Sequence, residues 1–300
     1  MPLAAFPKCY LDALTVHHTL TVEKWIDLAA EQLDVDGLEF YWGFTPHEDP
    51  KSLEALRLWA GAHSLTIPMM CYSPDFTRSD DAERKREVDE ARHAIAVTAA
   101  LGGKMCRVLS GQNRPEISRK DGITMAADCI TELLPDAEEH SVTLILENHY
   151  KDGYWELPEF AQKQDLFLEL LAAIPPSLYF GVNFDPSNAI IAGDDPIALL
   201  EAVKERVVSM HASDRYFEGG TLEDLQNQDL HPQRGYAPYV KHGVIGRGLN
   251  DYDRIFAILR DVGFRGWISI EDGDDPEVGM DHLRESATFL RTKMAEYGLP

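Results

Sequence analysis

The stretch TLILENHY, residues 143–150, begins as an apolar β-strand and ends on an acid, an amide and an imidazole. Three later apolar runs end in a similar way. GVNFD is uncharged until Asp185, VVSMH until His211 and WISIE until Glu271, just as TLILE is uncharged until Glu147. We therefore expect four strands that each carry one metal-competent side chain at the carboxyl end.

Short β-rich runs alternate along the whole chain with longer runs of helical periodicity. The strands are expected at 8–11, 37–41, 66–71, 105–109, 143–146, 179–184, 207–210 and 267–270, and the helices at 22–32, 51–62, 80–101, 122–140, 158–173, 196–205, 252–261 and 276–297. Eight strand–helix units without a linker predict an α/β fold, a single (β/α)₈ TIM barrel over residues 1–300. A doubly wound open sheet is the alternative, but no GxGxxG motif follows the first expected strand.

In a (β/α)₈ barrel the carboxyl ends of the strands converge on one rim, so the four polar residues become neighbours. Any one of them alone is more simply a helix cap or a core histidine, but four in successive strands are a harder coincidence. Three carboxylates and an imidazole suit a divalent cation of moderate hardness, and without one the carboxylates would raise each other's pKa. We expect one divalent cation, Mn²⁺ in the first place, with Mg²⁺, Co²⁺ and Zn²⁺ as alternatives.

The composition restricts the partners and the compartment. The net charge of -23 would repel a phosphate backbone, and acids flank the densest basic cluster, ERKRE at 83–87, so no nucleic-acid partner is expected. The 4 cysteines show no CxxC pairing. The N-terminus does not read as a signal peptide, and no run approaches the roughly 18 apolar residues of a membrane span. A cytoplasmic protein with reduced thiols and no membrane partner is expected.

The glycine-rich and polar segments sharpen this interpretation, because they resemble a known family. The chain resembles the xylose isomerase-like barrel superfamily, and within it the sugar isomerase/epimerase branch that includes tagatose 3-epimerase, inosose dehydratase and hydroxypyruvate isomerase. The matching segments are LILENH, GVNFDPSN, VVSMHASDR, GVIGRGLNDYDRIFAIL and GFRGWISIED. They cover the second half of the chain, and the first half matches only in its strand–helix rhythm.

The resemblance implies that Glu147, Asp185, His211 and Glu271 bind the metal, and that Glu147 and Glu271 also transfer protons. The implied activity is that of a metal-dependent sugar isomerase or epimerase. Such an enzyme abstracts a proton next to a metal-held carbonyl and proceeds through an enediolate. The expected partner is a small-molecule sugar substrate.

Two residues near the metal set depart from the pattern or add to it. Asn188 stands where epimerases of this branch commonly carry histidine, and an amide can hydrogen-bond a sugar hydroxyl but carries no proton at neutral pH. His149 lies two residues after Glu147, on the same face of an extended strand. It is a candidate catalytic acid or base, with a packing role as the alternative.

Three further residues are substrate-binding candidates alongside Asn188. Arg215 matches a position where the branch has an arginine near substrate oxygens. Arg107 lies in the fourth expected strand, within the predicted rim. Trp155, beside Tyr154 after the fifth strand, offers an aromatic ring that either stacks on a sugar or packs its own loop.

The connection after the seventh strand, residues 212–250, is long and rich in Gly, Pro and polar residues without a strong helical pattern. A loop of this length is typical of a lid or an interface element. It contains His231 and His242, for which a surface position is the default interpretation. A homo-oligomer is expected from the resemblance, and a role as a hetero-subunit is the alternative.

The same residues are compatible with other activities. The Asn188 substitution, His149 and the long loop favour a lyase or dehydratase that eliminates water or an aglycone from a keto sugar or a 3-keto glycoside. An abasic-site endonuclease of the same superfamily ranks lower, because the third and fourth strands end in MMCYSP and MCRVLSG without its additional histidines. A barrel without enzymatic activity is the last alternative.

Overall fold

The strands that end in the polar residues belong to one ring of parallel strands. The computed structural model describes residues 1–45, 49–226, 236–271 and 275–299. Within these residues the ring consists of β1 (Leu3–Ala5), β2 (Gly37–Leu38), β3 (Phe40–Tyr41), β4 (Met69–Cys71), β5 (Met105–Val108), β6 (Thr143–Glu147), β7 (Phe180–Phe184), β8 (Val207–Ala212) and β11 (Trp267–Ile270). Each strand pairs in parallel with its neighbours, as the (β/α)₈ prediction requires.

The ring closes through β2 and β3, which are two halves of one strand position. β2 pairs with β1, β3 pairs with β4, and a parallel bridge joins Gly37 to Thr66. Glu39 is the single residue between the two halves, and its backbone N–H donates to the Ala5 carbonyl at 3.1 Å. The chain therefore forms a nearly closed barrel, and a buried acid lies at the seam.

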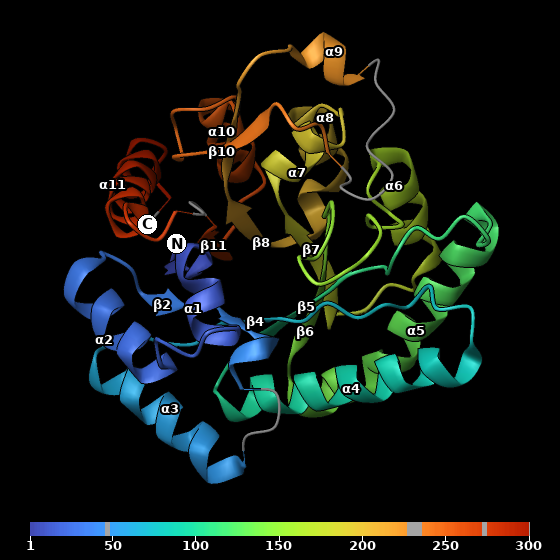
Figure 1. Ribbon diagram of the computed structural model, residues 1–300, viewed down its shortest axis with the longest axis horizontal. Coiled ribbons are helices and arrows are strands. Elements are labelled where there is room, and N and C mark those ends of the chain that lie inside the picture. The colour runs from blue at the N-terminus through green and yellow to red at the C-terminus, as the bar shows by residue number, and fades with distance from the viewer. Residues whose placement is uncertain (46–48, 227–235, 272–274, 300) are drawn as a thin grey trace.

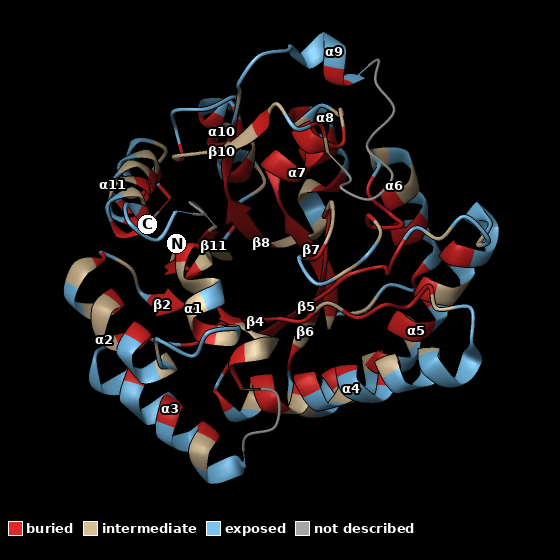
Figure 2. Cartoon of the chain, viewed as in Figure 1, coloured by how far each residue is buried: buried red, intermediate tan, exposed pale blue. Residues whose placement is uncertain are grey.

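Helices surround the ring, as Figure 1 shows. The longer ones are α2 (Val22–Gln32), α3 (Pro50–Ala62), α4 (Asp81–Ala100), α5 (Arg119–His140), α6 (Gln164–Ala173), α8 (Pro196–Val203), α10 (Tyr252–Asp261) and α11 (Gly279–Glu296). Shorter helical turns are η1 (Lys8–Tyr10), α1 (Leu11–Thr15), η2 (Trp42–Phe44), α7 (Pro186–Ile191), η3 (Lys204–Arg206) and α9 (Leu222–Gln226). Their outer faces are exposed while the strands are buried (Figure 2).

The expected first strand at 8–11 is wrong. The strand is Leu3–Ala5, and residues 8–15 form η1 and α1 instead. The run from Leu3 to Phe6 is buried between β11 and β2, and Pro7 precedes the first helical turn. The correction matters for the site, because it places Lys8 just beyond a strand end, on the same rim as the predicted metal ligands.

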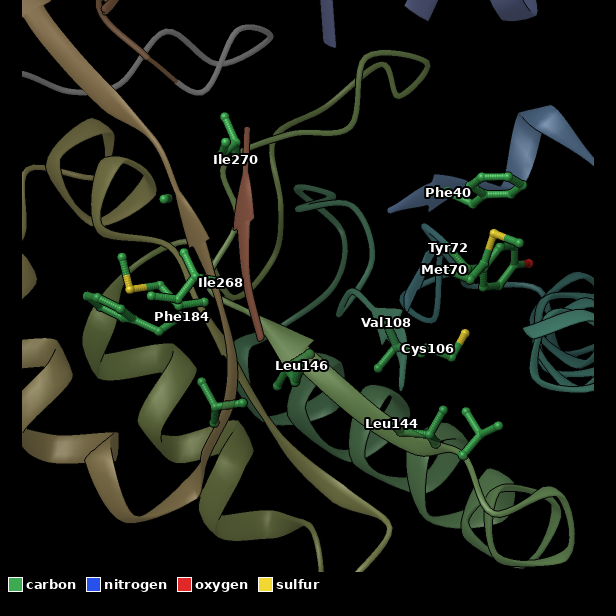
Figure 3. Packing of buried hydrophobic residues seen from close by; sticks show 14 of the residues in the cluster. Phe40, Met70, Tyr72, Cys106, Val108, Leu144, Leu146, Phe184, Ile268 and Ile270 are labelled. Carbon is green, nitrogen blue, oxygen red and sulfur yellow. The ribbon is translucent and has the colours of Figure 1, made fainter. Parts of the chain in front are cut away.

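Alternation along the strands decides which side chains enter the barrel. Leu144 and Leu146 pack outward with the main core beneath the helices (Figure 3), whereas Ile145 lies in a separate small cluster with Met69 and Met105. Successive strand residues point to opposite faces, so Glu147 shares the direction of Ile145. The apolar cluster closes the barrel below the polar rim.

The segment after β8 forms a hairpin of β9 (Asp214–Phe217) with β10 (Val240–Gly243), and α9 lies between them. Asp214 holds the return of the chain, because its carboxylate accepts the backbone N–H groups of Gly246, Gly248 and Asn250 at 2.9–3.1 Å. Residues 227–235, with the predicted surface residue His231, lie outside the described residues. The proposed lid or interface role of 212–250 stays a prediction.

Across the part of the chain that the structure describes, no helix is both long enough and apolar enough to cross a membrane.

Candidate metal centre and active site

The four predicted ligands meet at the centre of the rim. Glu147, Asp185, His211 and Glu271 each offer one ligand atom, and these atoms all lie within 4.8 Å of one another. The Nδ1 atom of His211 lies 3.1 Å from Glu147 Oε1 and 3.1 Å from Glu271 Oε2. The four residues thus form one cluster, although 124 positions of sequence separate Glu147 from Glu271.

The amide in LENH positions the neighbouring ligand. Asn148 forms two hydrogen bonds with the backbone of Asp185: its Nδ2 donates to the carbonyl at 2.7 Å, and its Oδ1 accepts the N–H at 2.9 Å. The Ser213 hydroxyl then donates to Asp185 Oδ1 at 2.7 Å. Asn148 therefore ties the ends of β6 and β7 together, and Ser213 orients the carboxylate.

Charges in the cluster are unevenly compensated. Burial would raise the pKa of Glu147, but His211, His149 and Arg107 outweigh it and lower this pKa to about 2. Burial and the carboxylates of Glu271 and Glu147 raise the pKa of Asp185 to about 6. The cluster thus holds a carboxyl group whose ionisation the neighbouring acids oppose.

These properties fit a divalent cation. A cation among three buried carboxylates would remove the repulsion that raises the pKa of Asp185. The donor set of oxygens and one imidazole nitrogen suits Mn²⁺, Co²⁺ or Zn²⁺. Glu147, Asp185, His211 and Glu271 are accordingly the residues that would hold the ion.

The opposite side of the His211 ring contacts an acid that the sequence interpretation missed. His211 Nε2 lies 3.0 Å from Glu39 Oε1, and the Cys71 thiol donates to the same oxygen at 2.5 Å. Burial raises the pKa of Cys71, so the thiol stays protonated. A signal for this role was present, because Glu39 is the only charged residue inside the expected strand 37–41.

Arg107 and Asn188 both donate to Glu147, at 3.0 Å to Oε2 and 3.0 Å to Oε1 respectively. Both side chains are buried, and Arg107 also donates to the hydroxyl of Ser73 at 2.5 Å. The structure therefore places these two substrate-binding candidates against a predicted metal ligand. Arg107 in addition lines the cavity described below.

His149 is buried at the rim beside Glu159. Its Nδ1 lies 3.6 Å from Glu159 Oε2, and its ring stacks on Tyr150 with the centroids 5.2 Å apart. Burial lowers the pKa of His149, but the carboxylates of Glu147 and Glu159 outweigh it and raise this pKa above its ordinary value. The imidazole is thereby favoured in its protonated form, as an acid catalyst requires.

A cavity of about 210 Å³ opens over the cluster. Its wall includes Glu39, Arg107, His149, His211 and Glu271 together with Lys8, whose ammonium lies 3.0 Å from Glu271 Oε1. Burial would raise the pKa of Glu271, but Lys8 and His211 lower it well below its usual range. The cavity therefore exposes acids, bases and hydrogen-bond donors to one small molecule.

Of the two neighbouring aromatic residues, Tyr154 rather than the predicted Trp155 lies in the cavity wall. Tyr154 lines the cavity, and its ring stacks on Tyr41 with the centroids 6.2 Å apart. Trp155 is half-buried and does not belong to the described lining. Arg215 lies in β9 with its guanidinium 5.7 Å from the centre of the Tyr150 ring, and it lines an adjacent second cavity.

Known proteins share this architecture. Residues 28–293 match the profile of the family described as xylose isomerase-like TIM barrel. An inosose dehydratase from Clostridium beijerinckii is 26% identical over 258 residues, which are 81% of this chain and 82% of that protein. An inosose dehydratase from Bacillus thuringiensis is 22% identical over 187 residues, 61% of this chain and 58% of that protein.

Solved structures agree with the fold. A D-tagatose 3-epimerase-like protein superposes with a TM-score of 0.75 at 18% identity, covering 99% of this chain and 98% of that one. The IolI protein with a bound zinc atom superposes with a TM-score of 0.74 at 16% identity, covering 99% of each chain. From the matched residues and the barrel, the chain belongs to the xylose isomerase-like TIM barrel family.

Proposed function

We propose that this protein is a divalent-metal-dependent sugar isomerase or epimerase that moves a proton next to a carbonyl group through an enediolate. The observation that carries the proposal is the convergence of Glu147 and Glu271, from β6 and from the end of β11, on the same nitrogen of His211. A cation held by these residues and Asp185 would stabilise negative charge on the substrate oxygens as the proton leaves. Mn²⁺ is the proposed ion.

The two glutamates perform the proton transfers. One carboxylate accepts the proton from the carbon next to the carbonyl, and the C–H electron pair becomes the double bond of the enediolate. The other glutamate takes a proton from solvent and delivers it to carbon, which gives an epimer on the opposite face of the same carbon or an isomer on the neighbouring carbon. Arg107 and Asn188 hold Glu147 in place through their 3.0 Å hydrogen bonds.

Proton transfer is tested by incubating the Mn²⁺-loaded protein with ketoses in D₂O and measuring deuterium at carbons next to the carbonyl. Replacing Glu271 with glutamine should lower the exchange rate at least ~100-fold, the range of a general acid–base group. The matched control is Glu201→Gln, because Glu201 is exposed and pairs only with Lys204 in the described residues. No exchange on any keto sugar would refute the proposal.

A second candidate function is elimination of water or an aglycone from a keto sugar or a 3-keto glycoside. The pair of His149 and Glu159 favours it, because a protonated imidazole in the cavity wall can give its proton to a leaving hydroxyl. The relatives named inosose dehydratase support the same class of reaction. After the first proton abstraction, the enediolate electrons expel the protonated oxygen and form an enone.

The two candidates give different products. Elimination should produce an absorbing enone and a mass lower by one water or one aglycone, and His149→Asn should abolish that product while retaining deuterium exchange. Epimerisation or isomerisation should return a sugar of unchanged mass. Quantitative recovery of an isomeric sugar would reject elimination, and enone formation without any isomer would reject the isomerase.

A further inference from the structure

A second cavity, of about 440 Å³, adjoins the first and differs from it in the charges of its lining. Its described lining consists of Lys8, Tyr150, Arg215, Tyr236, Pro238, Val240, Lys241 and His242. No acidic residue is among them, although the chain carries a net charge of -23. The wall of the first cavity is mixed: it contains the acids Asp12, Glu39, Asp152 and Glu271 together with the basic residues Lys8, Arg107 and Lys151. Cationic lining in so acidic a chain needs a specific reason.

Arg215 is the central group of this second cavity. The residue is only 4% exposed, and its Nε atom is buried without a hydrogen-bond partner. The carboxylate of the adjacent Asp214 is occupied by backbone N–H groups, and no described acid forms an ion pair with the Arg215 guanidinium. Among the described residues, the guanidinium lies over the Tyr150 ring, 5.7 Å from its centre.

A buried guanidinium with an unfilled donor is costly unless a ligand completes its contacts. Contact with an aromatic ring compensates for this cost only in part. The planar fork of arginine matches carboxylate and phosphate oxygens, which accept two parallel hydrogen bonds. The unfilled donor of Arg215 therefore indicates an anionic ligand.

Among the described lining residues, Lys8 is the group that adds positive charge beside Arg215. His242 lies directly across the β9–β10 ladder from Arg215, so both side chains share one face of the hairpin. Burial, Lys8 and Arg215 lower the pKa of His242 well below its usual range, which favours the neutral form of the ring. Lys241 pairs with Tyr216 in the ladder, and strand alternation therefore directs its side chain to the other face.

The two cavities are adjacent, because Lys8 and Tyr150 line both of them. One molecule can therefore place its carbonyl end at the metal cluster and another group beside Arg215. We propose that the second cavity is a subsite for an anionic group of the substrate, a carboxylate or a phosphate, held by Arg215 with Lys8 and the tyrosines. The inference rests on the proposed function for the carbonyl end and makes the substrate a sugar acid or a sugar phosphate.

Anion binding is tested directly on the Mn²⁺-loaded full chain by calorimetric titration with inorganic phosphate and, in a separate arm, with acetate. Arg215→Gln should weaken the binding of at least one of them roughly tenfold or more, the size of a lost charged hydrogen bond. The matched control is Arg206→Gln: Arg206 also lies over an aromatic ring, 5.5 Å from the centre of Phe180, but it precedes β8 at the other end of the barrel. Its affinity should equal that of the wild type.

Equal affinities in wild type and Arg215→Gln, which is what anions bound only to the Mn²⁺ ion would give, would overturn the subsite. Binding of neither anion would overturn it as well. If Arg215→Gln does not fold, a second experiment tests the subsite on the wild-type protein alone. Deuterium exchange is compared for D-fructose, D-fructose 6-phosphate and D-fructuronate, and kcat/KM should be at least ~tenfold higher for one of the anionic sugars.

The binding and exchange experiments distinguish the subsite from the proposed function, and a phosphate ligand from a carboxylate ligand. Equal exchange on all three sugars would refute the subsite and leave the proposed function intact. Phosphate or acetate binding that depends on Arg215, with no exchange on any keto sugar, would retain the subsite and refute the function. Preference for D-fructose 6-phosphate identifies a phosphate as the recognised group, and preference for D-fructuronate identifies a carboxylate.

Discussion

Replacing Glu39 with glutamine should weaken metal binding although Glu39 is not one of the four predicted ligands. The Glu39 side chain is fully buried, and its Oε1 contacts His211 Nε2 at 3.0 Å. A carboxylate on the far nitrogen of a ligating imidazole fixes the tautomer and raises the basicity of the ring. Glutamine keeps the shape, and its Nε2 would replace an oxygen that has no hydrogen-bond partner, Oε2 of Glu39. The substitution therefore removes mainly the charge.

The expected loss is about 10- to 100-fold in Mn²⁺ affinity, the usual effect of removing such a partner. It corresponds to about 1.4–2.8 kcal/mol of binding free energy. Two observations support the role of Glu39: with Glu147 it raises the pKa of His211 well above its ordinary value against the effect of burial, and both carboxylates lie about 3 Å from the ring nitrogens. Removing one of the two should lower the basicity of the ring.

Mn²⁺ dissociation constants are measured by titration calorimetry, with thermal melts at fixed Mn²⁺ as a second measurement. The matched control is Glu159→Gln, because Glu159 is also a buried glutamate beside an imidazole, His149, which is not a predicted ligand. Its Mn²⁺ affinity should stay within roughly twofold of the wild type, since no ligating ring is affected. A folded Glu39→Gln protein with wild-type affinity would show that Glu39 does not orient the metal ligand.

Asp185→Asn should stabilise the metal-free protein by up to about 3 kcal/mol above pH 6. The raised pKa of Asp185, about 6, makes its ionisation unfavourable in the fold, so this cost grows as pH rises from 3.8 to about 6. The variant should also lose stabilisation by Mn²⁺, and melting temperatures equal to those of the wild type, both without the ion and with it, would contradict both expectations. Asp75→Asn should destabilise by about 3 kcal/mol at pH 7, because Arg114 donates to both carboxylate oxygens at 2.9 and 2.6 Å. Burial opposes the ionised form of Asp75, but its hydrogen bonds lower its pKa below 3.8. The stabilisation by the ionised carboxylate is therefore present above pH 3.8 and is lost as the pH falls through the pKa of the folded protein. Urea unfolding at pH 7 and pH 3 measures this stabilisation, and equal stability of variant and wild type at pH 7 would contradict the prediction. Gly248→Ala should lower the melting temperature by several degrees, because a Cβ there would lie 2.2 Å from Asp214 Oδ1, and an unchanged melt would show that the turn relaxes freely.

The fold and the four-residue cluster could be predicted from the sequence because both depend on local periodicity. Alternation along TLILE puts Glu147 in the direction of Ile145, inside the barrel, and the repeated strand–helix rhythm fixes which ends share a rim. The first strand was misplaced because LAAF is a run of only four apolar residues, and the charged Lys8 after Pro7 was taken into the strand. Its register with β11 became evident only from the pairing of Leu3 with Ile268.

The sequence alone determined which side chains enter the barrel, since a strand directs every second residue to the same face regardless of its neighbours. Only the tertiary structure decided what each of them contacts. Glu39 reaches His211 across 172 positions, Asn148 clamps the backbone of Asp185, and Lys8 and Arg215 belong to one cationic cavity. These contacts depend on the stagger and closure of the ring, which bring distant strand ends within hydrogen-bond distance and which no local pattern encodes.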